Sequence, residues 1–142
     1  MVNKVGAVLF RRKLGIIEIL LVSSITRKRW LCPKGGVKKS ENFLEACHRE
    51  SFEEAGVKGN IYSNFPMNFL IESKSTVELI NYPVIFYPLE VTYIYKEWPE
   101  KKRNRKWINI NDYNSLIKEK DYITVIEFFR KLLPTLPSDK VN

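Results

Sequence analysis

The sequence predicts one mixed α/β domain, and three observations support this fold class. The chain of 142 residues has the length of one domain and can bury a core. Hydrophobic residues make up 44% and charged residues 28%, a balance typical of soluble globular proteins. Short apolar runs typical of strands surround two segments with helical spacing. We therefore expect a single domain over residues 1–134 and a frayed tail at 135–142.

The first elements are expected to be a hairpin and a short strand. Apolar runs at 5–10 and 16–22 flank a polar break that ends in glycine, a pattern typical of a hairpin. Residues 30–32 predict a short strand that stops at Pro33, because proline cannot donate a ladder hydrogen bond. A loop is expected at 34–39.

The clearest helix prediction covers residues 41–55, which contain neither proline nor glycine. Ser40 suits the N-cap and Gly56 suits the C-terminal turn. Residues three and four positions apart share one face of a helix, and that face is expected to point at the core. The residues on this face are Leu44, Cys47 and Ser51.

The rest of the chain predicts a mostly antiparallel or mixed sheet and a terminal helix. Apolar and polar residues alternate through 61–69 and 77–94, and 106–110 resembles a last short strand. An amphipathic helix is expected over 121–133, ended by Pro134. Three further prolines are expected to limit the strands: Pro66, Pro83 and Pro88.

The charge balance favours anionic partners. Lys and Arg number 24 against 16 Asp and Glu, a formal net charge of +8, so phosphate-rich molecules are expected partners and RNA is a possible one. The sequence has no signal peptide and no apolar run long enough to span a bilayer, which predicts a cytoplasmic protein without a membrane partner. It makes no prediction about oligomeric state.

The cysteine and histidine content argues against thiol or zinc chemistry. Cys32 and Cys47 are too few for a disulfide scaffold and lie in no metal-binding spacing. His48 is the one histidine, and we expect it to be a partly exposed helix residue. Any bound metal is therefore expected to have oxygen ligands.

Three carboxylates gather on the first predicted helix. Glu50, Glu53 and Glu54 project from one side and border the apolar face instead of opposing it. A solvated acidic face is one interpretation. The other is a site for Mg2+ or Mn2+, because partly buried carboxylates need cations and these metals prefer oxygen ligands. Gly35, in the preceding loop, could add a backbone carbonyl.

The spacing of eight residues resembles the Nudix box, G-x5-E-x7-R-E-U-x-E-E-x-G-U, where U is a bulky aliphatic residue. The matching residues are Gly35, Glu41, Arg49, Glu50, Glu53, Glu54, Gly56 and Val57. Ser51 departs from the aliphatic preference, and we expect its hydroxyl to bond back to the Cys47 carbonyl. The lead-in at 30–35 is similar to the W-x-x-P-K-G segment of Nudix hydrolases of dinucleoside polyphosphates and diphosphoinositol polyphosphates, as are 97–100 and 105–107.

This resemblance implies an α/β/α sandwich with a mixed central sheet and a divalent metal, Mg2+ or Mn2+, as cofactor. Glu50 and Glu54 would be the main metal ligands, with the Gly35 carbonyl as another. Glu53 would be a further ligand or would activate water. Arg49 would orient a carboxylate by a charge-assisted hydrogen bond.

The resemblance also implies hydrolysis of a phosphoanhydride bond by attack of water on phosphorus. Glu41 would support the loop. Glu100 is a candidate general base outside the box, because it lies in a segment where a similar subfamily has one. Its rivals, whose plain alternative is surface charge, are Glu72, Glu78 and Glu90.

Basic residues beside the box are the candidates for binding a small-molecule polyphosphate: Lys34, Arg27, Arg29 and Arg103. The run at 101–106 could equally be a solvated loop. Four aromatics could stack on a base but are more often core residues: Tyr82, Phe86, Tyr87 and Trp98. Two alternatives to a small-molecule hydrolase stay open, an RNA 5′-end pyrophosphohydrolase and a non-catalytic nucleotide- or RNA-binding module.

Overall fold

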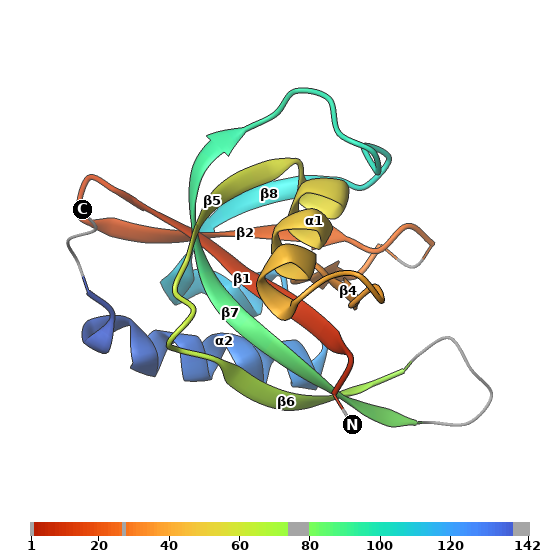
Figure 1. Ribbon diagram of the computed structural model, residues 1–142. Coiled ribbons are helices and arrows are strands. Elements are labelled where there is room, and N and C mark those ends of the chain that lie inside the picture. Colours follow the sequence, from red (N-terminus) through yellow and green to blue (C-terminus); the bar gives the residue numbers. More distant parts are fainter. Residues whose placement is uncertain (1, 27, 74–79, 138–142) are drawn as a thin grey trace.

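The computed structural model describes residues 2–26, 28–73 and 80–137 (Figure 1). The described residues form a mixed sheet in which β3, β2, β1, β7 and β5 are neighbours in that order, while β4 pairs with β1, β6 with β7 and β8 with β2. The strands are β1 (Lys4–Lys13), β2 (Ile16–Ser23), β3 (Trp30–Leu31), β4 (Lys34–Gly36), β5 (Val57–Ile61), β6 (Met67–Glu72), β7 (Asn81–Ile94) and β8 (Arg105–Asn109). The helices are α1 (Phe43–Ala55) and α2 (Lys120–Leu132), with 3-10 turns at η1 (Ile110–Ser115) and η2 (Leu133–Thr135).

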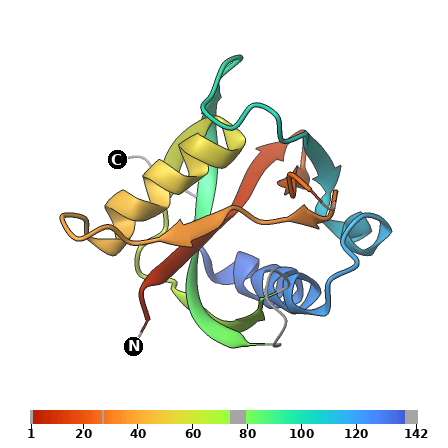
Figure 2. The same cartoon turned by 90° about the vertical axis from the view of Figure 1, so that its right-hand side faces the viewer.

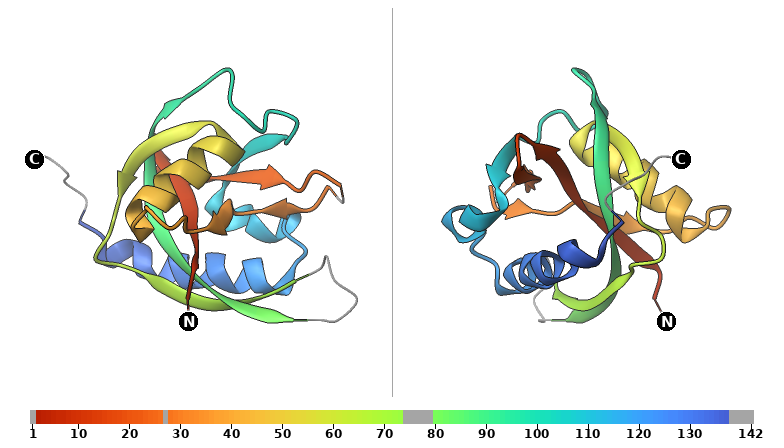
Figure 3. Two further views of the ribbon diagram at one scale, coloured as in Figure 1. Left: turned by 45° about the vertical axis from the view of Figure 1, so that its right-hand side comes forward. Right: turned by 90° about the vertical axis from the view of Figure 1, so that its left-hand side faces the viewer.

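The central strand β1 explains the three-layer architecture. Its side chains alternate between two buried clusters, as the period of two in a strand requires. Val5, Ala7 and Leu9 pack in the cluster that contains Ala46 and Cys47 of α1. Val8 and Phe10 pack in the other cluster, with residues of α2 such as Phe129. The sheet therefore lies between α1 and α2, as Figures 2 and 3 show, and the expected α/β/α sandwich is confirmed.

The predicted N-terminal hairpin is confirmed. β1 and β2 pair antiparallel, and the two residues between them, Leu14 and Gly15, both have positive φ. Such a two-residue turn matches the right-handed twist of the flanking strands. On its other edge β1 pairs with β7 in parallel. Because α1 and α2 cover the two faces of the sheet, β1 is buried on both faces, and its sequence is a continuous apolar run.

The N-terminal end of α1 differs from the prediction, whereas its C-terminal end agrees with it. Asn42, rather than Ser40, is the N-cap: its side chain accepts from the Glu45 backbone N–H, while the Glu45 carboxylate accepts from the Asn42 N–H. This reciprocal capping box satisfies two orphan donors, which Ser40 does not. Gly56 ends the helix in the left-handed conformation, as expected. Residues 34–36, predicted as loop, pair with β1 as the short strand β4.

The sheet beyond α1 also corrects the prediction. The segment 61–69 spans the end of β5, a turn and the start of β6, which begins just after Pro66 as expected, whereas β7 continues through Pro83 and Pro88. Pro83 precedes Ile85, where pairing with β1 begins, and Pro88 lies between the stretches that pair with β6 and with β5. Because each proline lies where one neighbouring ladder is absent, its missing N–H does not break the strand.

The C-terminal helix is confirmed, with Pro134 just beyond its end. The chain stays packed slightly further than the predicted tail boundary, because Leu136 is buried in the cluster on the α2 side of the sheet. None of the helices in the described parts of the chain combines the length and the hydrophobicity needed to cross a bilayer.

Candidate active site

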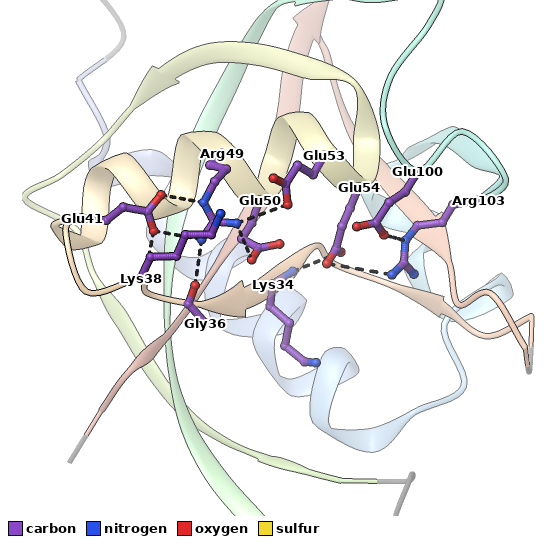
Figure 4. A network of polar contacts seen from close by, with 10 residues as sticks. All are labelled: Lys34, Gly36, Lys38, Glu41, Arg49, Glu50, Glu53, Glu54, Glu100 and Arg103. Atoms are coloured by element: carbon purple, nitrogen blue, oxygen red, sulfur yellow. Dashed lines mark hydrogen bonds and ion pairs between the residues drawn. The ribbon is translucent and has the colours of Figure 1, made fainter.

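The carboxylate face of α1 lies against β4 (Figure 4). The Lys34 backbone N–H donates to Glu54 Oε1 over 3.3 Å, while the lysine side chain extends away from that carboxylate. The Glu50 carboxylate occupies the space beside Gly35, where a Cβ atom would overlap it. A side chain at this position would therefore displace the Glu50 carboxylate from its present place. The backbone of β4 and the carboxylates of Glu50, Glu53 and Glu54 on α1 together form one surface, which we call the carboxylate wall.

Arg49 ties this wall together (Figure 4). Its Nε and Nη2 both bond the Glu41 carboxylate, the second over 2.9 Å, and Nη2 also donates to the Gly36 carbonyl over 2.8 Å. Nη1 reaches Glu50 Oε2 at 2.9 Å and Glu53 Oε1 at 3.2 Å. The planar guanidinium thus fixes three carboxylates and the end of β4 relative to one another.

Glu41 holds the loop that precedes α1. Besides Arg49, its carboxylate accepts from the Lys38 backbone N–H over 2.9 Å. The hydrogen bond from Arg49 is the main reason why the pKa of Glu41 falls from 4.5 to about 2, with the Lys38 N–H contributing next. Glu41 is therefore ionised throughout the neutral range and couples the loop to the helix.

Glu54 and Glu50 are carboxylates with too little compensation for their burial. The side chain of Glu54 is 12% exposed, and burial raises its pKa from 4.5 to about 8, although Arg103 at 4.0 Å opposes the shift. Burial also raises the pKa of Glu50, against the opposing hydrogen bond from Arg49. Two desolvated carboxylates that face each other's charge would be stabilised by a cation between them.

These residues fit a hard divalent cation. Glu50, Glu54 and the Gly35 carbonyl are oxygen donors, which Mg2+ and Mn2+ prefer. Within the described ranges, no three acidic, histidine or cysteine side chains stand close enough together to form a ready-made metal cluster. Arg49 and Arg103 instead hold the carboxylates in their present positions.

A segment distant in sequence joins the site. The Glu100 backbone N–H donates to the Glu53 carbonyl over 3.0 Å, and its carboxylate pairs with Arg103 Nε at 2.8 Å. Arg103 also donates to the Ser23 carbonyl and reaches Glu54. The structure therefore brings Glu100 and Arg103, two residues singled out from the sequence, to the carboxylate wall.

The rivals of Glu100 lie elsewhere or outside the described residues. Glu90 accepts from the Tyr62 hydroxyl over 2.7 Å and pairs with Arg12 at 3.4 Å. Glu72 lies at the end of β6 and faces a cavity described below. Glu78 belongs to the part of the chain that the structure does not describe, as does Arg27. Of the three candidates that the structure describes, Glu100 is the one whose backbone is bonded to the carboxylate helix.

Two adjoining cavities lead away from Glu54, and we call them together the basic channel. The first, of about 210 Å3, is lined among others by Glu54, Arg103, Lys34 and Arg29. The second, of about 220 Å3, shares Lys34 and Arg29 and extends to Tyr82. Buried Arg29 Nε has no hydrogen-bond partner within the described residues. An unsatisfied guanidinium donor beside a cavity is suited to an anion.

The aromatic candidates separate clearly. Phe86 and Tyr87 are core residues, and Trp98 is covered by the Arg105 guanidinium, 3.8 Å from its ring centroid. Tyr82 is half-buried and lines the channel, with Lys34 Nζ 5.4 Å from its ring centroid. Of the four aromatics, Tyr82 is therefore the one positioned to meet a ligand in the channel.

The basic run at 101–106 is not a uniformly solvated loop. Lys101 and Lys102 are exposed, and Lys101 pairs with Glu97 at 2.7 Å. Arg103 and Arg105, two positions apart, turn inward to α1. That spacing of two, at the entry to strand β8, is the signal that could have distinguished Arg105 in the sequence.

The departure of Ser51 from the Nudix pattern has a structural consequence. Ser51 is buried against the sheet, as expected, but the predicted bond to the Cys47 carbonyl is wrong, because the hydroxyl bonds no nitrogen or oxygen atom in the described part of the chain and lies instead beside the Cys47 thiol. In the helix ladder the carbonyl of residue 47 already receives the backbone N–H of residue 51. His48 is exposed, and both cysteines are buried free thiols.

Comparison with known proteins agrees with this geometry. The NUDIX domain family matches residues 2–130. Nudix hydrolase 12, mitochondrial, of Arabidopsis thaliana is 37% identical over 123 residues, which cover 82% of this chain and 60% of that protein. Diphosphoinositol polyphosphate phosphohydrolase 3-beta of Bos taurus is 36% identical over 102 residues, covering 67% of this chain and 57% of that protein.

A solved structure of Caenorhabditis elegans Ap4A hydrolase superposes with a TM-score of 0.73 at 25% identity and covers 96% of this chain and 100% of that one. The NUDIX domain of Shewanella oneidensis NrtR, solved with ADP ribose, shares the fold with a TM-score of 0.72 at 19% identity over 94% of this chain and 88% of that one. The chain spans about three fifths of the length of the curated relatives it matches. By its family match over most of its length, the chain belongs to the NUDIX domain family.

Proposed function

We propose that this protein is a divalent-metal-dependent hydrolase of phosphoanhydride bonds in a small polyphosphate, a dinucleoside polyphosphate or a diphosphoinositol polyphosphate. The observation that carries the proposal is the juxtaposition at Glu54. This carboxylate is nearly buried, its pKa is raised by that burial, and it opens directly into a cavity lined by Arg29, Lys34 and Arg103. A cation site beside a basic channel is suited to a diphosphate group.

In this proposal Glu50, Glu54 and the Gly35 carbonyl hold Mg2+ or Mn2+, with Glu53 as a further ligand. When bound, the metal neutralises charge on the diphosphate and lowers the pKa of the attacking water. Arg49 keeps Glu50 and Glu53 in place through its two contacts from Nη1. Phosphoryl transfer depends chiefly on positioning and electrostatics, which is what this network supplies.

Two carboxylates are candidates for accepting the proton of the attacking water. Glu53 is the more accessible member of the α1 group, with 31% of its side chain exposed. Glu100 is held against the helix by its backbone, while Arg103 keeps its carboxylate oriented. Glu53→Gln and Glu100→Gln separate them: the variant that loses the acidic limb of the pH profile of kcat identifies the base.

The channel provides the substrate contacts. Lys34 and Arg29 line both cavities, so a phosphate chain that begins at Glu54 would pass them before reaching Tyr82. Related proteins bear both substrate classes in their names, a diphosphoinositol polyphosphate phosphohydrolase and an Ap4A hydrolase. Tyr82 distinguishes them: Tyr82→Ala should raise KM for a dinucleoside polyphosphate, whose base can stack, more than for a diphosphoinositol phosphate.

The proposal is tested by turnover of a substrate panel in Mg2+ and in Mn2+. The panel contains diadenosine polyphosphates, diphosphoinositol phosphates, mutagenic nucleoside triphosphates and 5′-triphosphorylated RNA. We expect a small polyphosphate to be cleaved and Glu54→Gln to lower kcat at least ~100-fold, whereas Glu97→Gln, an exposed carboxylate, leaves it unchanged. Absence of turnover with every member and both metals, or full activity of Glu54→Gln, contradicts the proposal.

The net charge of +8 favours one second candidate, an RNA-directed protein. Release of pyrophosphate from triphosphorylated RNA would assign an RNA 5′-end pyrophosphohydrolase. Salt-sensitive RNA binding without any turnover would assign a binding module. Both outcomes come from the same panel, with binding measured at several salt concentrations.

A further inference from the structure

The C-terminal end of α1 is held by a segment some 40 residues further along the chain. The last carbonyls of a helix have no partner within the helix and must find one elsewhere. Here two backbone N–H groups provide it: Tyr95 N donates to the Gly56 carbonyl over 2.7 Å, and Glu100 N donates to the Glu53 carbonyl over 3.0 Å. The segment 95–100 therefore lies along the C-terminal end of α1 and is hydrogen-bonded to it at both of its ends.

Two side chains complete this arrangement. Trp98 Nε1 donates to the Glu54 carbonyl over 3.1 Å, and Arg105 Nη1 donates to the Ala55 carbonyl over 2.8 Å. Arg105 Nη1 also lies 3.3 Å from the Gly56 carbonyl. Successive carbonyls of the last turn, from residue 53 to residue 56, are thus each bonded to the same distant segment.

The two side chains also support each other. The Arg105 guanidinium stacks on the Trp98 ring at 3.8 Å, and its Nη2 donates to the Tyr95 carbonyl over 2.6 Å. A Cβ on Gly56 would lie 2.7 Å from Arg105 Nη1 and 2.8 Å from Trp98 Cγ, so glycine is needed here for space as well as for its φ of +66°. We call Trp98 and Arg105, with the carbonyls they bind, the helix clasp.

The helix clasp lies between the two halves of the site. Glu53 and Glu54 belong to the turn whose carbonyls are bound, and Glu100 and Arg103 belong to the segment between Trp98 and Arg105. The direct side-chain contact between the halves is weak, with 4.0 Å between Arg103 Nη2 and Glu54 Oε2. The relative position of Glu54 and Glu100 is therefore set by bonds to the helix end, together with the bonds of residues 103 and 104 to Ser23, and not by their own contact.

We propose that Trp98 and Arg105 are positioning residues, which fix the Glu100–Arg103 pair against the metal-binding face of α1 without touching the substrate. The proposal rests on the proposed function only for its catalytic consequence. Its structural content is that loss of either donor loosens the 95–105 segment at the last turn of α1, where the backbone bonds of Tyr95 and Glu100 remain. Catalytic groups displaced by about an ångström can lose on the order of 100-fold in rate.

The test uses two conservative variants. Trp98→Phe keeps an aromatic ring for Arg105 but removes the N–H, and Arg105→Lys keeps the charge but removes the planar fork. Two controls match them: Glu97→Gln breaks an exposed ion pair in the same segment, and Arg130→Lys alters an arginine that stacks on Tyr113 from α2. Unfolding midpoints are measured for all four, and the assays are run well below the lowest midpoint.

Three readouts are expected to change together in the two clasp variants. The amide protons of Tyr95 and Glu100, which bond the helix carbonyls, should exchange with solvent at least ~10-fold faster. The affinity of the substrate-free protein for Mn2+ should fall several-fold, as Glu54 loses its fixed position. The kcat should fall at least ~10-fold with KM changed less than about twofold, as expected for lost positioning. In a Glu100→Gln background, Trp98→Phe should lower kcat by a markedly smaller factor than it does in the wild-type protein, because the two changes act on one group.

Unchanged exchange of the two amides, or faster exchange with unchanged kcat and Mn2+ affinity, overturns the proposal. A loss of activity that follows only the lowered unfolding midpoint, and disappears at lower temperature, also overturns it. If the wild-type protein cleaves no polyphosphate, the proposed function fails, while amide exchange and Mn2+ affinity still decide whether the clasp positions the site.

Discussion

Replacing Glu54 by glutamine should stabilise the metal-free protein while it abolishes the proposed activity. The pKa of Glu54 is raised from 4.5 to about 8 by burial, so the native state keeps a proton that the unfolded state has released. Between these two values the unfolded state binds fewer protons, and stability therefore falls as the pH rises from 4.5 through 8. Glutamine has nearly the same size and carries no charge at any pH, which removes this dependence.

The size of this change in the free energy of unfolding follows from the shift in the pKa of Glu54. At pH 7 the unfolded state has passed its pKa by roughly 2.5 pH units, and each unit is about 1.36 kcal/mol, so the cost of Glu54 is at most about 3 kcal/mol. For a domain of this size the melting temperature moves roughly 4 °C per kcal/mol. In EDTA at pH 7 we expect Glu54→Gln to melt up to ~12 °C above wild type, with the difference vanishing near pH 4.5.

Bound metal should reverse the order of the two melting temperatures, so that wild type melts above Glu54→Gln. Mg2+ or Mn2+ that binds the native state raises the melting temperature of wild type in proportion to the logarithm of its concentration, and Glu54→Gln should lose this response. The assay is thermal unfolding followed by circular dichroism across pH, with and without metal, with Glu97→Gln as the control. A Glu54→Gln variant that is less stable than wild type in EDTA at pH 7, or that is stabilised equally by metal, contradicts the role given to Glu54.

Other substitutions test separate parts of the structure. Lys34→Ala should raise KM roughly tenfold with little change in kcat, because the side chain lines the channel while the backbone bond to Glu54 survives. Ser51→Ala should raise the free energy of unfolding by about 1 kcal/mol, as it removes a buried hydroxyl that bonds no nitrogen or oxygen atom in the described part of the chain, and initial rates should be unchanged. The lowered pKa of Glu41 contributes stability that is lost as the pH falls from 4.5 through about 2, so acid unfolding of Glu41→Gln should depend less on pH in that window. A Glu41→Gln curve parallel to that of wild type would contradict the role given to the Arg49 contact.

The carboxylate face of the site could be anticipated from local sequence, because one helix carries its carboxylates. Glu50 and Glu54 lie four apart, and the glycine pair before the helix indicates a close backbone approach. The positions of Glu100 and Arg103 depend instead on contacts with Glu53 and Glu54, which lie more than 45 residues earlier in the chain. The periodic patterns of helices and strands do not indicate contacts over such a separation. The presence of these two residues beside α1 is set by Trp98 and Arg105, whose bonds are to backbone carbonyls and leave no pattern of paired residue types in the sequence.

The errors in the predicted fold have similar physical causes. Proline was expected to end strands, but Pro83 and Pro88 lie where one neighbouring ladder is missing, and neighbours in a sheet cannot be derived from a strand's own residues. Ser40 and Asn42 are both good capping residues, and the choice between them depended on Glu45 closing the capping box. The hairpin and the two helices were predictable because their signals are local. The cytoplasmic location stays a prediction, as does the extent of a single domain at 1–134.

We propose that the carboxylate face of α1 supports metal-dependent attack of water on a phosphoanhydride. The most direct measurement is hydrolysis of the best panel substrate in 18O-labelled water, with the products examined by mass spectrometry in the presence of Mg2+, in EDTA and with Glu54→Gln. We expect one 18O atom in a phosphate-containing product, bound to phosphorus, with wild type and metal only. Label at carbon, equal turnover in EDTA, or no turnover of any polyphosphate would contradict the claim.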